Sequence, residues 1–335
     1  MVGRTQCVKF GDILSDSVIL EKGVPQGSIL GPLLFLLYVN NICSNSVHSK
    51  EHMFADDTVI YSCSPSLDVA VSNLASDFDS LQHELRKHKL LLNGQKTKAM
   101  LFSPNRTVID PPIISTLDGV PIEWVSQYKY LGIWLDNKLT FLHHIDSLTK
   151  KLKFTLSFFY RMKSCFSPGS RKKVVTALFL SQLDYGDTVY RFASSTALSK
   201  LDPLFHAALR FITNSAYRTH HCILYSLVGW TSLTSRRMLH WYTFIYKAIL
   251  GDLPSYICSK FQPIQNSLNL RSNCWLRYVV PTTRSEVGKK GLAFFGPWSW
   301  NDLQTRLKLA FLIPLVSFKR IAMGTLTSPC TCFDD

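Results

Sequence analysis

Residues 23–35, GVPQGSILGPLLF, place three glycines and two prolines immediately before an apolar run. Glycine supplies backbone torsions that other residues avoid and permits close approach of another molecule, whereas proline fixes its torsion and removes a hydrogen-bond donor. These residues predict a docking turn followed by a buried helix over residues 33–42. The uncharged apolar run of residues 29–39 is far shorter than the roughly 20 residues that a membrane-spanning helix needs, so we expect no membrane span.

Two adjacent aspartates, Asp56 and Asp57, lie within the apolar segment HMFADDTVIYS, residues 52–62. Its aromatic and β-branched residues predict a β-hairpin with both carboxylates at the tip. An Asp-Asp pair is most often a solvated turn, but here the flanking strands are apolar. Hard oxygen ligands on a rigid element suit Mg²⁺, and two such ions can stabilise the attacking and leaving oxygens of a phosphoryl displacement.

Beyond the hairpin, the pattern of apolar residues first predicts both helices and strands and then helices alone. Ser66 is expected to cap a helix that carries apolar residues at three and four spacing and stops before Asn93-Gly94. The segments KTKAMLF and YKYLGIWLD read as strands, the first pairing antiparallel with the acidic hairpin. Helices are predicted over residues 142–162, from Ser167-Pro168, and over residues 201–213 and 236–249, with a loop-rich remainder. The expected fold class is therefore α+β, with strands confined to the first half.

Charge is divided unevenly along the chain. Residues 1–150 hold 13 Lys and Arg against 15 Asp and Glu, whereas residues 151–335 hold 24 against 8. A polyanionic partner would therefore be bound by the second half, and its binding would depend steeply on salt.

Cysteine usage and the first residues favour a reducing compartment. The start MVGRTQCVKFGD has no apolar signal region, so we expect an intracellular protein, nuclear or cytoplasmic, and not a secreted one. The nine cysteines lack zinc-ligand spacing. His220-His221-Cys222 comes nearest to a metal cluster, but ordinary buried or surface side chains account for it better.

Four segments in order carry a family resemblance. GVPQGSILGPLLF, FADDT, NGQKTKAMLF and YKYLGIWLD resemble the palm motifs of reverse transcriptases from non-LTR (LINE-type) retrotransposons, with 29 positions between Gly27 and Asp56. The later segments WTSLTSRRMLHWYTFIYKAILGDLPSY and GKKGLAFFGPWSWNDL look like the region that follows the polymerase domain in animal elements. The resemblance thus covers nearly the whole chain. It implies a partial polymerase palm, an antiparallel sheet with helices, over residues 1–137. A basic helical thumb-like region over 138–215 and a helical, loop-rich basic region over 216–335 would follow.

The resemblance also implies roles for individual residues. Asp56 would be the metal-binding aspartate of a two-Mg²⁺ site, Asp57 its less directly ligating neighbour, and Lys96 the basic residue near the departing pyrophosphate. The turn beside template base and incoming nucleotide would comprise Pro25, Gln26, Gly27 and Ser28. The turn that holds the primer end would comprise Tyr130, Leu131 and Gly132. Backbone phosphates of the duplex would meet Lys150, Lys151, Lys153, Arg171, Lys172 and Lys173. The partners would be an RNA template, a DNA primer and deoxynucleotides. The sequence does not indicate an oligomeric state.

One part of the family pattern lacks a counterpart. Family members carry a further metal-binding aspartate, inside an FD or YD motif, on a strand dozens of residues upstream of the glycine-rich turn. Only 22 residues precede Gly23, and Asp12 and Asp16 do not match that motif. We therefore expect the C-terminal part of an RNA-directed DNA polymerase that is inactive alone. A non-catalytic nucleic-acid-binding remnant and a pseudogene fragment without stable function stay open as alternatives.

The aromatic segment GLAFFGPWSWNDL allows two interpretations. Phe294, Phe295, Trp298 and Trp300, next to Lys289 and Lys290, would either stack nucleic-acid bases or form a small aromatic core.

Overall fold

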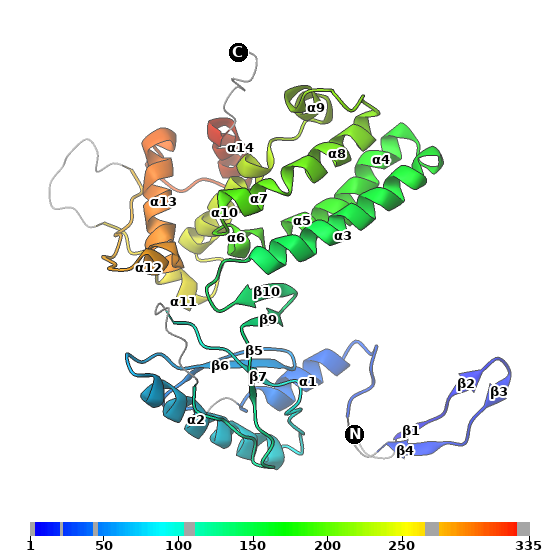
Figure 1. The fold of residues 1–335 in the computed structure, drawn as a ribbon, viewed down its shortest axis with the longest axis vertical. Coiled ribbons are helices and arrows are strands. Elements are labelled where there is room, and N and C mark those ends of the chain that lie inside the picture. Colours follow the sequence, from blue (N-terminus) through cyan, green and yellow to red (C-terminus); the bar gives the residue numbers. More distant parts are fainter. Residues whose placement is uncertain (1–3, 21–22, 43–45, 104–110, 265–274, 327–335) are drawn as a thin grey trace. The chain divides into compact units, whose positions relative to one another are not determined.

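The computed structural model describes residues 4–20, 23–42, 46–103, 111–264 and 275–326, and the chain divides into two compact units, Met1–Ser126 and Gln127–Asp335 (Figure 1). Both strands and helices occur, which agrees with an α+β fold. None of the described helices is long and apolar enough to cross a membrane.

The first unit contains small sheets and two helices. A ribbon pairs β1 (Arg4–Gln6) with β4 (Val18–Leu20) and β2 (Lys9–Phe10) with β3 (Ile13–Leu14). Then come α1 (Gly31–Val39), the hairpin β5 (Lys50–Phe54) and β6 (Asp57–Tyr61), and α2 (Leu67–Lys87). The short strands β7 (Lys98–Ala99) and β8 (Glu123–Trp124) close this unit.

Two expectations for this unit are wrong. The strand after Lys96 does not extend the acidic hairpin: β7 pairs with β8, and in parallel, while β5 and β6 form a two-stranded sheet within the described residues. The helix α1 is not buried on all sides, since Leu33, Leu36 and Leu37 are 54%, 51% and 67% exposed. Its sequence is apolar throughout, so hydrophobicity alone gives no indication of which side is covered.

The core of the first unit lies between α2 and the segments packed on it. Val71 and Phe78, apolar residues at helical spacing on α2, are buried with Ile114 and Ile122. Leu81 of the same helix is buried in a separate cluster with residues 39 and 42. The predicted helix after Ser66 is thereby confirmed, and it ends at Lys87.

The second unit begins with a hairpin and continues as helices. The segment YKYLGIWLD, predicted as one strand, is the hairpin of β9 (Gln127–Tyr130) and β10 (Ile133–Asp136). Helix α3 (Leu142–Arg161) follows as predicted, because Ile145, Leu148, Leu152, Leu156 and Phe159 form one buried stripe.

A long helical segment then turns back along α3. After η1 (Lys163–Cys165), α4 (Pro168–Val174) starts at the predicted cap Ser167, whose Oγ accepts from the N–H of Ser170. It continues through a π-helical turn, η2 (Val175–Leu180), into α5 (Ser181–Asp184). The next elements are α6 (Asp187–Tyr190), α7 (Ser195–Ser199), α8 (Asp202–Thr213) and α9 (His221–Val228).

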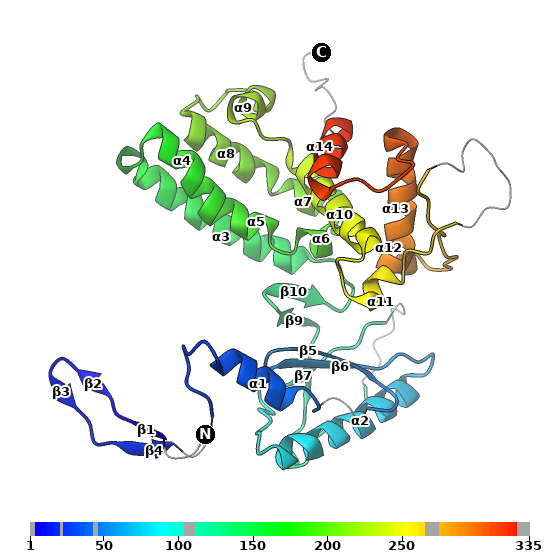
Figure 2. The same cartoon turned by 180° about the vertical axis from the view of Figure 1, so that it is seen from behind.

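The last helices build a second core within the same unit. Helix α10 (Leu233–Leu250) ends at Gly251, and α14 (Leu315–Leu326) packs along it, as Figure 2 shows from behind. Between them in sequence lie α11 (Ser255–Cys258), α12 (Glu286–Lys290) and α13 (Leu292–Leu307). The predictions for α8 and α10 are confirmed, whereas α13 and α14 lie in the stretch that was expected to be loop-rich.

Candidate functional site

The hairpin β5–β6 presents Asp56 and Asp57 at its tip, as predicted. Phe54 pairs with Asp57, so Ala55 and Asp56 alone form the connecting turn. Ala55 adopts a left-handed φ of 54°. A residue with a Cβ reaches such torsions at a cost of about 1–3 kcal/mol, and strain of this kind concentrates at functional sites.

The two faces of this hairpin differ. Met53 and Ile60 pack toward the core, whereas Asp57 lies on the opposite face with Phe54, because side chains alternate along a strand. Both aspartates are exposed, and no hydrogen bond or ion pair engages either carboxylate in the described part of the chain. Four carboxylate oxygens are therefore free to bind a cation.

Asp77 of α2 holds the segment that leads into β5. Its buried carboxylate accepts the backbone N–H groups of Val47, His48 and Ser49 at 3.1, 2.9 and 2.5 Å. Burial alone raises the pKa of Asp77, but the hydrogen bonds outweigh it and hold the pKa below its usual value. Sequence analysis missed this residue, because its partners lie 28–30 positions away.

The glycine-rich turn is built on Ser28. The N–H and Oγ–H of Ser28 donate to the Pro25 carbonyl at 3.3 and 2.8 Å, and its Oγ accepts from the Gly31 N–H at 3.0 Å. Gly27 takes a φ of 81°, which favours glycine, and Gln26 is exposed. A Cβ on Gly31 would lie 2.9 Å from the Pro25 carbonyl oxygen, so this glycine is required by close packing.

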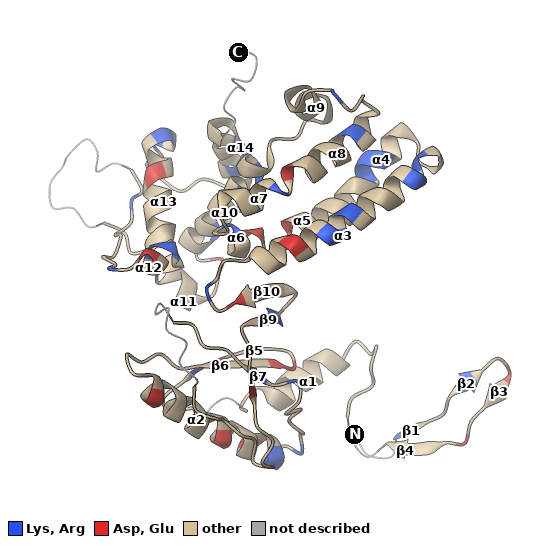
Figure 3. Cartoon of the chain, viewed as in Figure 1, with Lys and Arg blue, Asp and Glu red and all other residues tan. Residues whose placement is uncertain are grey.

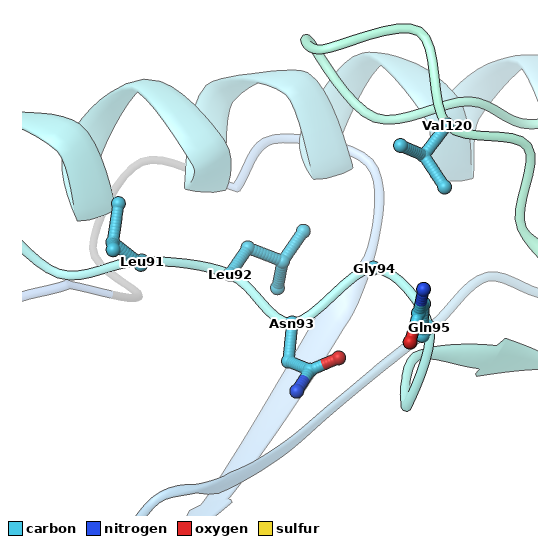
Figure 4. A pocket seen from close by; sticks show the side chains of 6 residues that line it. All are labelled: Leu91, Leu92, Asn93, Gly94, Gln95 and Val120. Atoms are coloured by element: carbon cyan, nitrogen blue, oxygen red, sulfur yellow. The ribbon is translucent and has the colours of Figure 1, made fainter.

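Lys96 lies in a turn of its own next to a cavity. Its N–H donates to the carbonyl and the side-chain oxygen of Asn93, and its exposed side chain makes no hydrogen bond or ion pair within the described residues. The cavity, of about 370 Å³, is lined by residues 91–95 and Val120 (Figure 4). No hydrogen bond or ion pair joins Lys96 to the acidic hairpin in the described ranges.

The turn between β9 and β10 belongs to the second unit. Leu131 and Gly132 have φ values of 44° and 83°, the signs of a type I′ turn that matches strand twist. Tyr185 donates from its hydroxyl to the Leu131 carbonyl at 2.7 Å, and a Cβ on Gly132 would lie 3.1 Å from the Tyr185 ring. Tyr130 is half-buried at the end of β9.

Asp136, at the end of β10, fixes the chain between this turn and α3. Its buried carboxylate accepts the N–H groups of Lys138, Thr140 and Phe141 and the hydroxyl of Thr140, at 2.7–3.1 Å. Burial raises its pKa, but these bonds together lower it below the usual value. The bonded residues follow within five positions, so the local sequence DNKLTF contains a signal for this turn.

The predicted phosphate-binding cations do not share one environment. Figure 3 shows Lys and Arg along α3, α4 and α8. Lys150, Lys151, Lys153 and Lys173 are exposed and make no ion pair within the described ranges. The other two have structural contacts as well. The Arg171 guanidinium lies over the Phe211 ring, and the Lys172 ammonium donates to the Val228 carbonyl at 2.7 Å.

Two groups of three potential metal ligands lie away from the acidic hairpin in the described part of the chain. Within the described residues these groups are His220, His221 and Cys222, and Asp184, Asp187 and His240, each with ligand atoms within 4.8 Å. Among the residues that the structure describes, no third ligand gathers in this way with Asp56 and Asp57. In the first group, His220 accepts the Cys222 N–H at Nδ1 and thereby caps α9; in the second, His240 contacts Asp187 at 2.5 Å.

The aromatic segment of α13 forms a core. Trp300 is fully buried and stacks on Tyr246 and Phe318, while Phe295 contacts Trp241. Trp298 is 49% exposed. The interpretation as a small aromatic core is therefore confirmed for Trp300.

Comparison with known proteins identifies what this arrangement resembles. Residues 6–135 match the family model described as reverse transcriptase (RNA-dependent DNA polymerase). The RNA-directed DNA polymerase from mobile element jockey of Drosophila melanogaster is 30% identical over 208 residues, covering 59% of this chain and 22% of that protein. The probable RNA-directed DNA polymerase from transposon BS of the same species is 28% identical over 210 residues, covering 59% and 23%. The Pol polyprotein from type-1 retrotransposable element R1 of Bradysia coprophila is 26% identical over 231 residues, covering 66% and 23%.

The chain therefore spans less than a quarter of the length of these relatives. The matched segment contains the glycine-rich turn, the acidic hairpin, Lys96 and the turn at Leu131. The predicted resemblance is confirmed to this extent: residues 6–135 match the reverse transcriptase family, and the chain is similar to RNA-directed DNA polymerases of non-LTR mobile elements.

Proposed function

We propose that this chain is the C-terminal part of an RNA-directed DNA polymerase that adds deoxynucleotides to a primer end. The observation that carries the proposal is the strained hairpin tip, where two exposed carboxylates, without a hydrogen bond or ion pair in the described ranges, lie within a segment that matches the reverse transcriptase family. The substrates would be an RNA template, a DNA primer and deoxynucleotides, and the compartment intracellular.

Asp56 and Asp57 have the donor chemistry that Mg²⁺ requires. Their oxygens are hard ligands, they project from paired strands, and no neighbouring cation neutralises them in the described part of the chain. Bound Mg²⁺ would supply charge stabilisation for phosphoryl transfer. Asp56 would be the principal ligand and Asp57 the secondary one, and the exposed Lys96 ammonium would bind the departing pyrophosphate.

The remaining predicted residues would position the reactants. The turn of residues 25–28 would lie against the template base and incoming nucleotide, where Gly27 leaves the backbone uncovered. The turn of residues 130–132 would hold the primer end, since the Tyr185 hydroxyl fixes it through the Leu131 carbonyl. Positioning of this kind contributes much of the rate enhancement in phosphoryl transfer.

The 335-residue chain by itself would not extend a primer. Two adjacent carboxylates hold paired metals poorly, and no third ligand gathers with them among the described residues. An upstream segment with the third aspartate would complete the site. Residues 138–215 would act as the thumb and residues 216–335 as a further basic region.

A second candidate function is non-catalytic binding of nucleic acid. Two features favour it: the lysines of α3 are exposed and make no ion pair with any residue that the structure describes, and 24 basic residues stand against 8 acidic ones beyond residue 150. Binding through these residues needs neither metal nor the acidic hairpin.

A primer-extension assay separates these functions. The chain is joined to the upstream part of the jockey polymerase, and extension on an RNA template is measured with Mg²⁺. The joined protein should extend the primer, Asp56→Asn should abolish extension, and Asp57→Asn should reduce it less. Asp68→Asn, which removes an exposed carboxylate from α2, should leave extension intact. Filter binding at matched salt should be equal for all four proteins.

Two results would refute the proposal. Extension by the chain without an upstream segment would disprove the incomplete site, and full activity of the Asp56→Asn protein would exclude the hairpin from the chemistry. Binding without any extension by the joined protein would favour the second candidate.

A further inference from the structure

Three consecutive side chains at the start of α9 bring metal-binding atoms together. His220, His221 and Cys222 each offer one ligand atom, and these atoms lie within 4.8 Å of one another. Atoms bound to one tetrahedral Zn²⁺ lie about 3.3–3.8 Å apart, because Zn–N and Zn–S bonds are about 2.0–2.1 and 2.3 Å long. All three side chains are only half-buried, so a shift of about 1 Å would close them around one ion.

The bend of the backbone at His220 explains how neighbours in sequence can share an ion. His220 is extended, with a ψ of 144°, whereas His221 and Cys222 are the first residues of the helix. The imidazole of His220 folds back over the helix start, where its Nδ1 accepts the Cys222 N–H at 3.4 Å. Backbone N–H donors usually lie about 2.9–3.0 Å from their acceptors, so this contact is weak and a metal ion would displace it easily.

Aromatic contacts hold the two imidazoles beside each other. The ring centroids of His220 and His221 are 4.1 Å apart. His221 also stacks on His206 of α8, with 5.2 Å between centroids and 11° between the ring planes. His206 is held in turn by a hydrogen bond of 2.7 Å between its Nε2 and the Tyr225 hydroxyl. The ligand rings are therefore positioned before an ion arrives, which reduces the entropy lost on binding.

The charges around these rings suit a cation. Burial lowers the pKa of His221, and the nearby His220 lowers it further, while Asp202 of α8 acts in the opposite direction. His221 is therefore neutral at pH 7, the form in which imidazole binds a metal. Asp202 brings a negative charge that acts on both Arg237 and His221. A negative charge close to the ligands favours a bound cation.

The other group of three potential ligands in the described ranges, Asp184, Asp187 and His240, is less suited to a metal. It contains no sulfur, and its side chains already pair with one another or with an arginine. The Asp184 carboxylate accepts two hydrogen bonds from the Arg236 guanidinium, at 2.7 and 2.5 Å. His240 contacts Asp187 at 2.5 Å. A cation would have to displace the guanidinium from Asp184.

We propose that His220, His221 and Cys222 form a Zn²⁺ site with three protein ligands and a fourth position open to water. Two imidazoles and a thiolate suit Zn²⁺, whereas Mg²⁺ prefers oxygen ligands. The Cys222 thiol releases its proton to solvent when the sulfur binds. The sequence alone favours ordinary side chains here, and only the folded start of α9 brings the ligand atoms together. The site uses neither nucleic acid nor Asp56, so it is independent of the proposed polymerase activity.

Titration of the intact, metal-free chain with Co²⁺ tests the site, because a thiolate bound to Co²⁺ gives a charge-transfer absorption band. One Co²⁺ per chain should produce this band, and Zn²⁺ should remove it by competition. Cys222→Ser should abolish the band and weaken Zn²⁺ binding about tenfold or more. His220→Asn, which keeps a favourable N-cap side chain, should weaken binding to a similar degree.

Matched controls come from the same unit. Cys165→Ser and His143→Gln remove an exposed cysteine and an exposed histidine, and both variants should bind Co²⁺ and Zn²⁺ as the unaltered chain does. A thiolate band that persists in Cys222→Ser, or that disappears in Cys165→Ser, would overturn the proposal.

Amide hydrogen exchange of the unaltered chain supplies a test that does not depend on how well a variant folds. Saturating Zn²⁺ should slow exchange about tenfold or more in peptides covering residues 219–226, because the ion binds the folded start of α9. Peptides of α3 should exchange as before. Equal exchange of residues 219–226 with and without Zn²⁺ would refute binding at this site.

Discussion

Asp77 offers a test of how the acidic hairpin is held in place. Replacing Asp77 by alanine removes three backbone hydrogen bonds from residues 47–49, directly before β5. Each hydrogen bond to a charged group contributes about 1.5–3 kcal/mol. Val47 and His48 are exposed, so water replaces part of their bonding, and we expect a total loss of about 2–4 kcal/mol rather than the full sum. Asp77→Asn keeps an acceptor oxygen and should lose about half as much.

Amide hydrogen exchange of the intact chain is the appropriate assay, because it resolves local opening. Peptides covering residues 47–61 should exchange about 30-fold faster or more in Asp77→Ala, whereas peptides of α3 should be unchanged. Asp79→Ala, which removes an exposed charge two positions away on the same helix, is the control and should show no such change. Unaltered exchange of residues 47–61 in Asp77→Ala would refute the anchoring role.

The remaining predictions concern the second unit. Phe159→Ala removes a fully buried ring stacked on Phe211 at 5.3 Å, and urea unfolding should show a loss of about 3–5 kcal/mol; a loss below about 1 kcal/mol would mean that this contact is not part of a close-packed core. Burial, and then nearby positive charges, lower the pKa of His206 to about 4, so its contribution to stability is complete above pH about 6.5 and is lost as pH falls towards 4. A pH series of thermal unfolding should show this decline, and His206→Gln should flatten it. Tyr246→Phe removes a hydroxyl that donates to the Ile313 carbonyl at 2.6 Å and accepts its N–H at 2.7 Å, and calorimetry should show a loss of about 1–3 kcal/mol.

Periodic patterns explain which elements the sequence predicts. Helices α2 and α3 follow from apolar spacing because their partners cover one face only, so that Leu152 is buried and Lys153 exposed. The acidic hairpin follows from its aromatic and β-branched residues on either side of two adjacent aspartates. The sequence does not predict helix α13, because proline and glycine usually interrupt helices. Gly291 lies at its N-cap, and Gly296 and Pro297 lie inside it.

The site residues also fall into two groups: those that the sequence alone predicts and those that only the folded chain reveals. Asp56, Lys96 and the glycine-rich turn are recognisable from short motifs. Asp77 and Tyr185 act on loops 28 or more positions away, and such contacts depend on the folded chain rather than on local spacing.

The π-helical turn η2 has a consequence for chain length. An α-helix rotates by about 100° per residue. Deleting one residue between Lys172 and the buried Leu183 in a regular α-helix would therefore rotate one of these side chains by about 100° relative to the other. In η2 one residue is already accommodated as a bulge. A deletion there would leave a regular α-helix with both side chains on their present faces, so residues 175–180 are where we expect the helix to tolerate the loss of one residue.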